Sequence, residues 1–205
     1  MKKILLIIAL ISLSACNGKF DTKKFDLRKD CTGNETNKTL SDVFCKKKII
    51  LIMSFEDNLK KLNINLPSAA NPVGSYVATK ITGKYLFISG QISIDKNGDL
   101  IKGKIGKDLS TDEGYKAAER CAINIIAQAK KACDNNLNKI KSCVKLTGYV
   151  NSTDDFIEQP KVINGASDLI ASVFEGAGMH TRAAVSTNSL PLGVAVEVDA
   201  IFELN

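Results

Sequence analysis

The sequence contains no tryptophan, only one histidine (His180), and no Cys-x-x-Cys pair or Cys/His cluster among its six cysteines. The missing cluster argues against a zinc site, and we predict no bound metal. No serine or cysteine can be paired convincingly with the one histidine, so the sequence does not indicate a nucleophile–histidine hydrolase. The glycines at 103 and 106 lack the spacing of a phosphate-binding loop, and we assign that segment no nucleotide role.

Charge is unevenly distributed along the 205 residues. The formal net charge is +6, yet residues 53–205 carry 17 basic and 17 acidic side chains, whereas residues 1–52 carry 11 and 5. The long C-terminal part is therefore neutral, and it also lacks a basic strip with interleaved aromatic residues. These features argue against nucleic acid as a partner. A hydrophobic content of 44% suits one globular domain with a proper core.

Residues 1–16 have the pattern of a secretory signal. Lys2 and Lys3 precede a ten-residue apolar run, which is too short to cross a bilayer because that takes about 20 residues. The sequence Leu-Ser-Ala-Cys at residues 13–16 resembles the bacterial lipobox, which implies cleavage before Cys16 and lipidation of its thiol. Cys16 could also be an incidental cysteine in a secretory leader. We expect a lipoprotein that faces outside the cytoplasm and is attached to the membrane by its lipid anchor only.

Residues 17–52 are polar and basic, and we interpret them as a tether that need not fold. Cys31 and Cys45 lie within it and could pair in an oxidising compartment, although their spacing does not decide this. A second short basic and apolar run ends at Met53. Translation from Met53 would give a cytoplasmic protein, which is the alternative location.

Residues 53–205 show alternating strand and helix signals. Ser54 with Asp57 and Ser110 with Glu113 fit capping boxes at the starts of helices. Strands are expected at residues 76–81, 85–94 and 140–150, the last with Val144, Leu146, Gly148 and Val150 on one face. A second long helix is expected from about residue 157 to the glycine stop at 176–178. Two further strands flank residues 189–193. The order β-β-α-β-α-β-β predicts an α+β fold with two helices on one face of a mixed sheet.

The two C-terminal runs carry a candidate pair of opposite charges. In the last run the valines at 194, 196 and 198 alternate with Glu197 and Asp199, which places both acids on the face opposite the core. Arg182 lies in the preceding run. We expect the two runs to pair as neighbouring strands, so that Arg182 and Glu197 face a common space. Taken alone, such a pair is most often an exposed cross-strand ion pair.

Short motifs lie in order along residues 54–205, at residues 72–76, 86–92, 162–165, 182–186 with Leu190-Pro191, and 196–201. Together they resemble the motifs of the RidA/YjgF family, which is also called "endoribonuclease L-PSP". Each motif is weak, and their combination is specific. A segment at residues 62–67 and others near residues 114 and 120 resemble a longer sister subgroup of that family.

The resemblance implies a chorismate-mutase-like fold and a homotrimer with ligand clefts between subunits. The family's arginine and acid fall on Arg182 and Glu197, and its pocket residues on Tyr76, Ser89, Asn164 and Ala184. Ala184 stands where short members often have cysteine. A guanidinium suits the carboxylate of a 2-imino acid, and a carboxylate can activate water for attack on the imine carbon. This chemistry requires no cofactor, because the imino or enamine acid is already reactive.

Three functions remain open at this level. The first is hydrolytic deamination of 2-imino or enamine acids to 2-oxo acids and ammonia. The second is a tethered, non-catalytic protein that binds a small carboxylate through Arg182. The third is a ribonuclease, as the family's older name suggests, although the neutral domain argues against it. The sequence does not identify the substrate.

Overall fold

The computed structural model describes residues 54–205, and all structural statements below concern these residues. The predicted signal sequence, Cys16, the tether and the alternative start at Met53 lie outside them. None of the described helices is long and apolar enough to cross a membrane.

The three α-helices begin where the local sequence predicts. Helix α3 (Phe55–Lys61) and helix α4 (Thr111–Ala132) both start with complete capping boxes, formed by Ser54 with Asp57 and by Ser110 with Glu113. Helix α5 (Gln159–Phe174) has a proline in its first turn, where the missing N–H costs nothing. Short 3-10 turns follow at Leu137–Lys139, Glu175–Gly178 and Pro191–Gly193.

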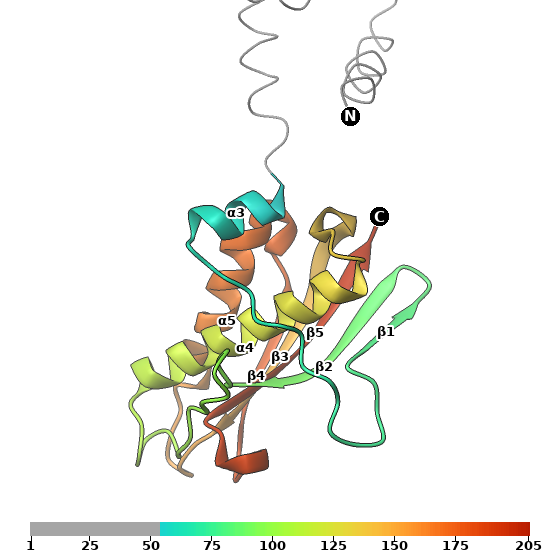
Figure 1. The fold of residues 1–205 in the computed structure, drawn as a ribbon. Helices are drawn as coiled ribbons and strands as arrows, with labels where there is room; N and C mark the ends of the chain where they lie inside the picture. Colours follow the sequence, from blue (N-terminus) through green and yellow to red (C-terminus); the bar gives the residue numbers. More distant parts are fainter. Residues whose placement is uncertain (1–53) are drawn as a thin grey trace, which may run out of the picture. The chain divides into compact units, whose positions relative to one another are not determined.

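Five strands form one mixed sheet in the order β1-β2-β5-β3-β4 (Figure 1). Strands β3 and β4 are parallel and are joined through α5, while every other neighbouring pair is antiparallel. This arrangement confirms the predicted α+β fold and the mixed sheet. The strand bounds are β1 (Thr79–Thr82), β2 (Tyr85–Ile92), β3 (Ile140–Asn151), β4 (Thr181–Thr187) and β5 (Val196–Leu204).

The expected pairing of the two C-terminal strands is wrong. Strand β5 lies between β2 and β3, whereas β4 is at the edge of the sheet on the far side of β3. The segment that joins β4 to β5 therefore passes over an intervening strand. A local turn signal at residues 189–193 cannot distinguish this longer connection from a hairpin.

Both long helices pack on the same face of the sheet (Figure 1). The buried stripe of α4 is rich in alanine, which lets the helix approach the strands closely. Two glycines make the packing of α5 tighter still. A Cβ atom on Gly148 of β3 would collide with Ile163 of α5, and one on Gly165 of α5 would collide with the carbonyl oxygen of Tyr115 on α4. The helix-covered face therefore has no spare volume at these points.

The other face of the sheet is covered by no described helix, and we call it the open face. It carries apolar side chains that are 43–47% exposed: Tyr85, Phe87 and Val185. Val144 was expected to share a face with Leu146, Gly148 and Val150, which are buried, but the β3–β5 register shifts between Cys143 and Lys145. Cys143 takes the buried position there, and Val144 is only half-buried.

Candidate functional site

Arg182 lies on the edge strand β4 and faces the helix side of the sheet. It is paired in the parallel ladder with Leu146 of β3, which is fully buried beneath the helices. Paired residues of adjacent strands point to the same face. The Arg182 side chain accordingly reaches α5, yet it remains exposed because β4 has no neighbour on its outer side.

A chain of hydrogen bonds holds the Arg182 guanidinium. Its Nη1 donates to Asn164 Oδ1 at 2.7 Å and to Ser167 Oγ at 3.1 Å, both on α5. Ser167 Oγ in turn lies 3.0 Å from His180 Nε2, and His180 Nδ1 lies 2.6 Å from the carbonyl oxygen of Gly178. No acidic side chain among the described residues pairs with Arg182, so its charge is available to an anionic ligand.

Glu197 lies on the open face. Its neighbours Val196 and Val198 are fully buried against the helices, and the alternation of strand β5 sends Glu197 the other way. Its carboxylate lies directly over the backbone of Gly90, at the point where the β2–β5 register shifts. Glycine at position 90 leaves room for the carboxylate there, because a Cβ atom would occupy the same space. Burial, and secondarily the charge of Asp199, raise the pKa of the Glu197 carboxyl.

Within one chain, Arg182 and Glu197 do not share a space. They point to opposite faces of the sheet, and β3 lies between their strands. The expectation that they face each other across neighbouring strands is therefore wrong for a single copy. A ligand that contacts both side chains must lie where two copies of the chain meet.

The four remaining predicted site residues fall into two groups. Asn164 and Ala184 lie near Arg182: Asn164 bonds to it, and Ala184 pairs with Gly148 on the same face, two positions along β4. Tyr76 and Ser89 lie near the opposite edge of the sheet, where Tyr76 precedes β1 and Ser89 is part of β2. Tyr76 is in a loop and half-exposed, because β1 begins only at Thr79, so the strand expected at residues 76–78 is not formed. Ser89 Oγ donates to the Val77 carbonyl at 2.8 Å and so fixes the loop beside Tyr76.

The cysteines of the described region are unsuited to act as nucleophiles. Cys121, Cys133 and Cys143 are free and buried. Burial raises the pKa of all three thiols, that of Cys143 to about 12. Within residues 54–205 no three His, Cys, Asp or Glu side chains are grouped so as to hold a metal ion.

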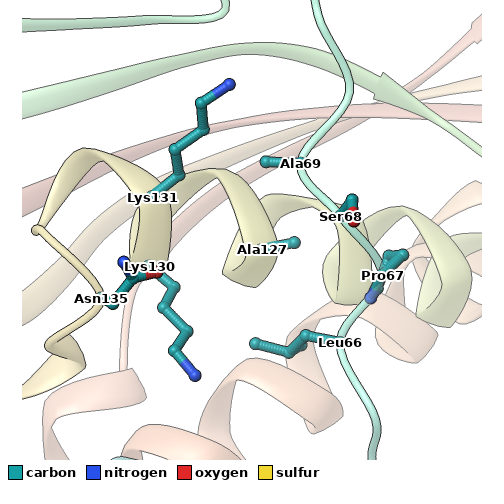
Figure 2. Close-up of a pocket in the computed structure, with 8 residues that line it drawn as sticks. All are labelled: Leu66, Pro67, Ser68, Ala69, Ala127, Lys130, Lys131 and Asn135. Carbon is teal, nitrogen blue, oxygen red and sulfur yellow. The ribbon is translucent and has the colours of Figure 1, made fainter.

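A surface pocket of about 430 Å³ lies elsewhere, between the segment at residues 66–69 and the C-terminal part of α4. Figure 2 shows Lys130 and Lys131 projecting to either side of this helix, with Leu66 and Pro67 passing alongside. None of the predicted site residues lines it. A smaller hollow of about 190 Å³ lies where α4 and α5 cross, and Tyr115 and Asp168 line it. Both hollows are separate from the Arg182 and Glu197 regions.

Three residues of the candidate site were not identified as site residues from the sequence. Ser167 gave no signal, since a serine on a helix is common. His180 was considered as a partner for a catalytic nucleophile, and the structure bonds it to Ser167. Gly90 was part of a matched motif, but its role in leaving room for the Glu197 carboxylate depends on a register shift that no local pattern shows.

Comparisons with known proteins identify the family. Residues 56–204 match the family described as "YjgF/chorismate_mutase-like, putative endoribonuclease". Protein TCP17 of Trypanosoma cruzi is 46% identical over 149 residues, which are 72% of this chain and 92% of that protein. A RutC family protein of Pyrococcus horikoshii is 31% identical over 65% of this chain and 90% of its own length.

Two crystal structures agree with this assignment. A protein of unknown function from Agrobacterium tumefaciens (Atu1372) is 42% identical, with a TM-score of 0.69 over 74% of this chain and 94% of that one. A protein from Shewanella oneidensis, described as "a putative endoribonuclease", is 35% identical, with a TM-score of 0.71 over 74% of this chain and 100% of that one. The matched family model, these relatives and the strand order agree, and the chain belongs to the YjgF/RidA/RutC family.

Proposed function

We propose that this protein hydrolyses reactive 2-imino or enamine acids to 2-oxo acids and ammonia. The observation that carries the proposal is the Arg182 guanidinium, which is exposed, held by α5 and free of any acidic partner among the described residues. It provides a planar fork for a carboxylate. Membership of the YjgF/RidA/RutC family is consistent with a small-molecule imine deaminase.

The chemical step needs one acid–base group and one water. Arg182 holds the carboxylate of R–C(=NH)–COO⁻, and Glu197 takes a proton from water as its oxygen bonds to the imine carbon. The C=N electron pair moves to nitrogen, which takes the proton held by Glu197 and gives an aminol. Glu197 then takes the hydroxyl proton of the aminol and passes it to nitrogen as the C=O bond forms, the C–N bond breaks and ammonia leaves. The raised pKa of Glu197 brings this carboxyl closer to neutral pH, which favours such proton transfers.

In one chain Arg182 and Glu197 are too far apart to contact the same ligand, so this site would need a second copy. Arg182 and Glu197 face opposite sides of the sheet, and the open face carries exposed Tyr85, Phe87 and Val185. Burial of such an apolar surface favours association. We therefore propose a homotrimer in which Arg182 of one copy and Glu197 of the next contact the same ligand, and light scattering should give the mass of three chains.

A complementation experiment tests both parts of the proposal. An amino-acid oxidase generates the imino acid in situ, and release of 2-oxo acid beyond the spontaneous rate is measured. Arg182→Ala and Glu197→Gln homotrimers should each be nearly inactive. Co-expressed, they should recover roughly a quarter of the wild-type activity, because random mixing pairs an intact arginine with an intact glutamate in that share of interfaces. No recovery would contradict a site shared between copies.

A second candidate function is a non-catalytic protein that binds a small carboxylate. Its support is that the Arg182 cluster is complete within one chain, whereas Glu197 is remote from it. An inactive wild type that still binds pyruvate would favour this function over deamination.

We also propose that a lipid on Cys16 attaches the protein to a membrane, on the strength of the lipobox-like sequence at residues 13–16. Wild-type protein should enter the detergent phase in a partitioning experiment, and the Cys16→Ala variant should remain in the aqueous phase. A soluble wild-type product that begins at Met53 would contradict the proposal.

A further inference from the structure

We infer that His180 and Ser167 are positioning residues for Arg182, and that they turn its guanidinium so that the edge formed by Nε and Nη2 receives the ligand carboxylate. The inference deepens the proposed function, on which it rests for the class of ligand. It concerns binding geometry, so it can be tested whether or not the protein turns over a substrate.

The hydrogen-bond donors of Arg182 are divided between protein and ligand. A guanidinium carries five N–H groups, two of them on Nη1. Both Nη1 donors are used within the protein, by Asn164 Oδ1 at 2.7 Å and Ser167 Oγ at 3.1 Å. No residue among 54–205 accepts a hydrogen bond from Nε or Nη2. These two nitrogens offer parallel N–H groups on one edge, which match the two oxygens of a carboxylate.

The direction of each hydrogen bond follows from what its atoms can do. The Gly178 carbonyl oxygen only accepts, so His180 Nδ1, at 2.6 Å, carries a hydrogen. In a neutral imidazole, Nε2 is then an acceptor, and the Ser167 hydroxyl donates to it at 3.0 Å. That leaves a lone pair of Ser167 Oγ for Arg182 Nη1. The series runs from Arg182 through Ser167 and His180 to Gly178, with a donor and an acceptor at every step.

Gly178, the last residue in this series of hydrogen bonds, is tightly packed against α5. Gly178 is buried, and a Cβ on it would lie 2.5 Å from the carbonyl oxygen of Ile170 and 2.7 Å from Ala171 Cα, both on α5. Its carbonyl is thus held close to the backbone of the same helix that carries Ser167 and Asn164. Arg182, by contrast, is a long, exposed side chain on an edge strand. Fixing it before the ligand arrives reduces the conformational entropy that binding must overcome.

His180 is the only histidine in the chain, so its NMR signals are unambiguous. Long-range ¹H–¹⁵N spectra of the full-length protein should show the Nδ1–H tautomer, with an Nε2 resonance shifted by a hydrogen bond. In Ser167→Ala the tautomer should persist, since Gly178 still accepts, while the hydrogen-bond shift at Nε2 is lost. An Nε2–H tautomer in the wild type would overturn the inference.

Binding and kinetics provide the second test, with pyruvate as the probe. Ser167→Ala and His180→Ala should each weaken pyruvate binding by roughly tenfold, and Ser167→Thr, which keeps the hydroxyl, should restore most of it. In the deamination assay KM should rise by a similar factor while kcat is largely retained. The matched control is Ser172→Ala on the same helix, whose hydroxyl bonds the Asp168 carbonyl instead, and it should bind as wild type.

The outcomes separate this inference from the proposed function. Wild-type pyruvate affinity in both Ser167→Ala and His180→Ala would overturn the positioning role, even in an active enzyme. In another outcome, the wild-type protein releases no 2-oxo acid, while Ser167→Ala and His180→Ala still bind pyruvate more weakly than it does. That outcome would refute the deaminase and support the positioning role.

Discussion

The two faces of the sheet hold their charged groups in different ways. On the helix side, Arg182 is exposed and oriented by hydrogen bonds to two residues of α5. On the open face, Glu197 is half-buried, and its carboxylate rests over Gly90 with no hydrogen-bond partner among the described residues. Arg182 therefore has a defined geometry, whereas Glu197 has a shifted pKa. A cation that binds a carboxylate through two hydrogen bonds must be correctly oriented. An acid–base group must instead have a pKa close to the working pH.

Glu197→Gln should produce the largest effect on the open face. The rate of deamination should fall on the order of a hundredfold or more, with pyruvate binding largely retained, because the amide cannot take a proton from water. A single-turnover assay and a binding titration measure the two quantities. Equal losses in both would assign Glu197 a binding role instead.

The same substitution has a pH-dependent effect on stability. Because the folded-state pKa of Glu197 lies above its ordinary value of 4.5, ionising it costs stability as the pH rises through the folded-state pKa. Glu197→Gln should therefore unfold at a higher temperature than wild type at neutral pH, and this advantage should vanish below about pH 4.5.

Arg182→Ala should remove most turnover and weaken pyruvate binding roughly 10- to 100-fold, the scale of lost charge-assisted hydrogen bonds. Arg182→Lys should recover little of either, since an ammonium lacks the planar fork. Calorimetric titration and the deamination assay check this. Full recovery by lysine would indicate that only the positive charge matters.

Gly165→Ala tests the tight packing of the helix side. The added methyl collides with the backbone of Tyr115, so the free energy of unfolding should fall by about 1–3 kcal/mol. Gly176→Ala is the control, because a Cβ there meets nothing within 4 Å. Denaturant titrations of both variants should differ accordingly, and equal midpoints would contradict the packing argument.

Gly90→Ala should have the smallest effect on folding, yet it should affect catalysis. The new methyl takes the space of the Glu197 carboxylate, which is the end of a flexible side chain and can move aside. We expect turnover to fall roughly tenfold with little change in stability. In a Glu197→Gln background the same change should add almost nothing, and an additive loss would show that Gly90 acts independently.

The sequence predicted features that depend on a few adjacent residues. Both capping boxes form as expected, because a cap is complete within four residues. The alternation of β5 correctly placed its valines in the core and Glu197 opposite. The resemblance to the family supplied the fold.

Features that depend on partners distant in the sequence were not predicted. The side of the sheet that Arg182 faces is set by its pairing with Leu146 of β3, which no turn signal near residue 190 encodes. The position of Val144 is set by a register shift against β5. The Ser167–His180 contact joins a helix to the segment that follows it. Each depends on which strand or helix lies alongside, and local periodicity carries no information about that.

The position of β5 has a consequence for biosynthesis. This central strand is made of residues 196–204, so it leaves the ribosome after every other element of the sheet. Until then no strand connects the β1–β2 hairpin to the β3–α5–β4 unit, and the backbone edges of β2 and β3 that will pair with β5 have no partner. The sheet therefore cannot close until residues 196–204 have been synthesised. The pairings of β5 with β2 and β3 are thus the last to form, and the joining of the two units into one sheet depends on these nine residues.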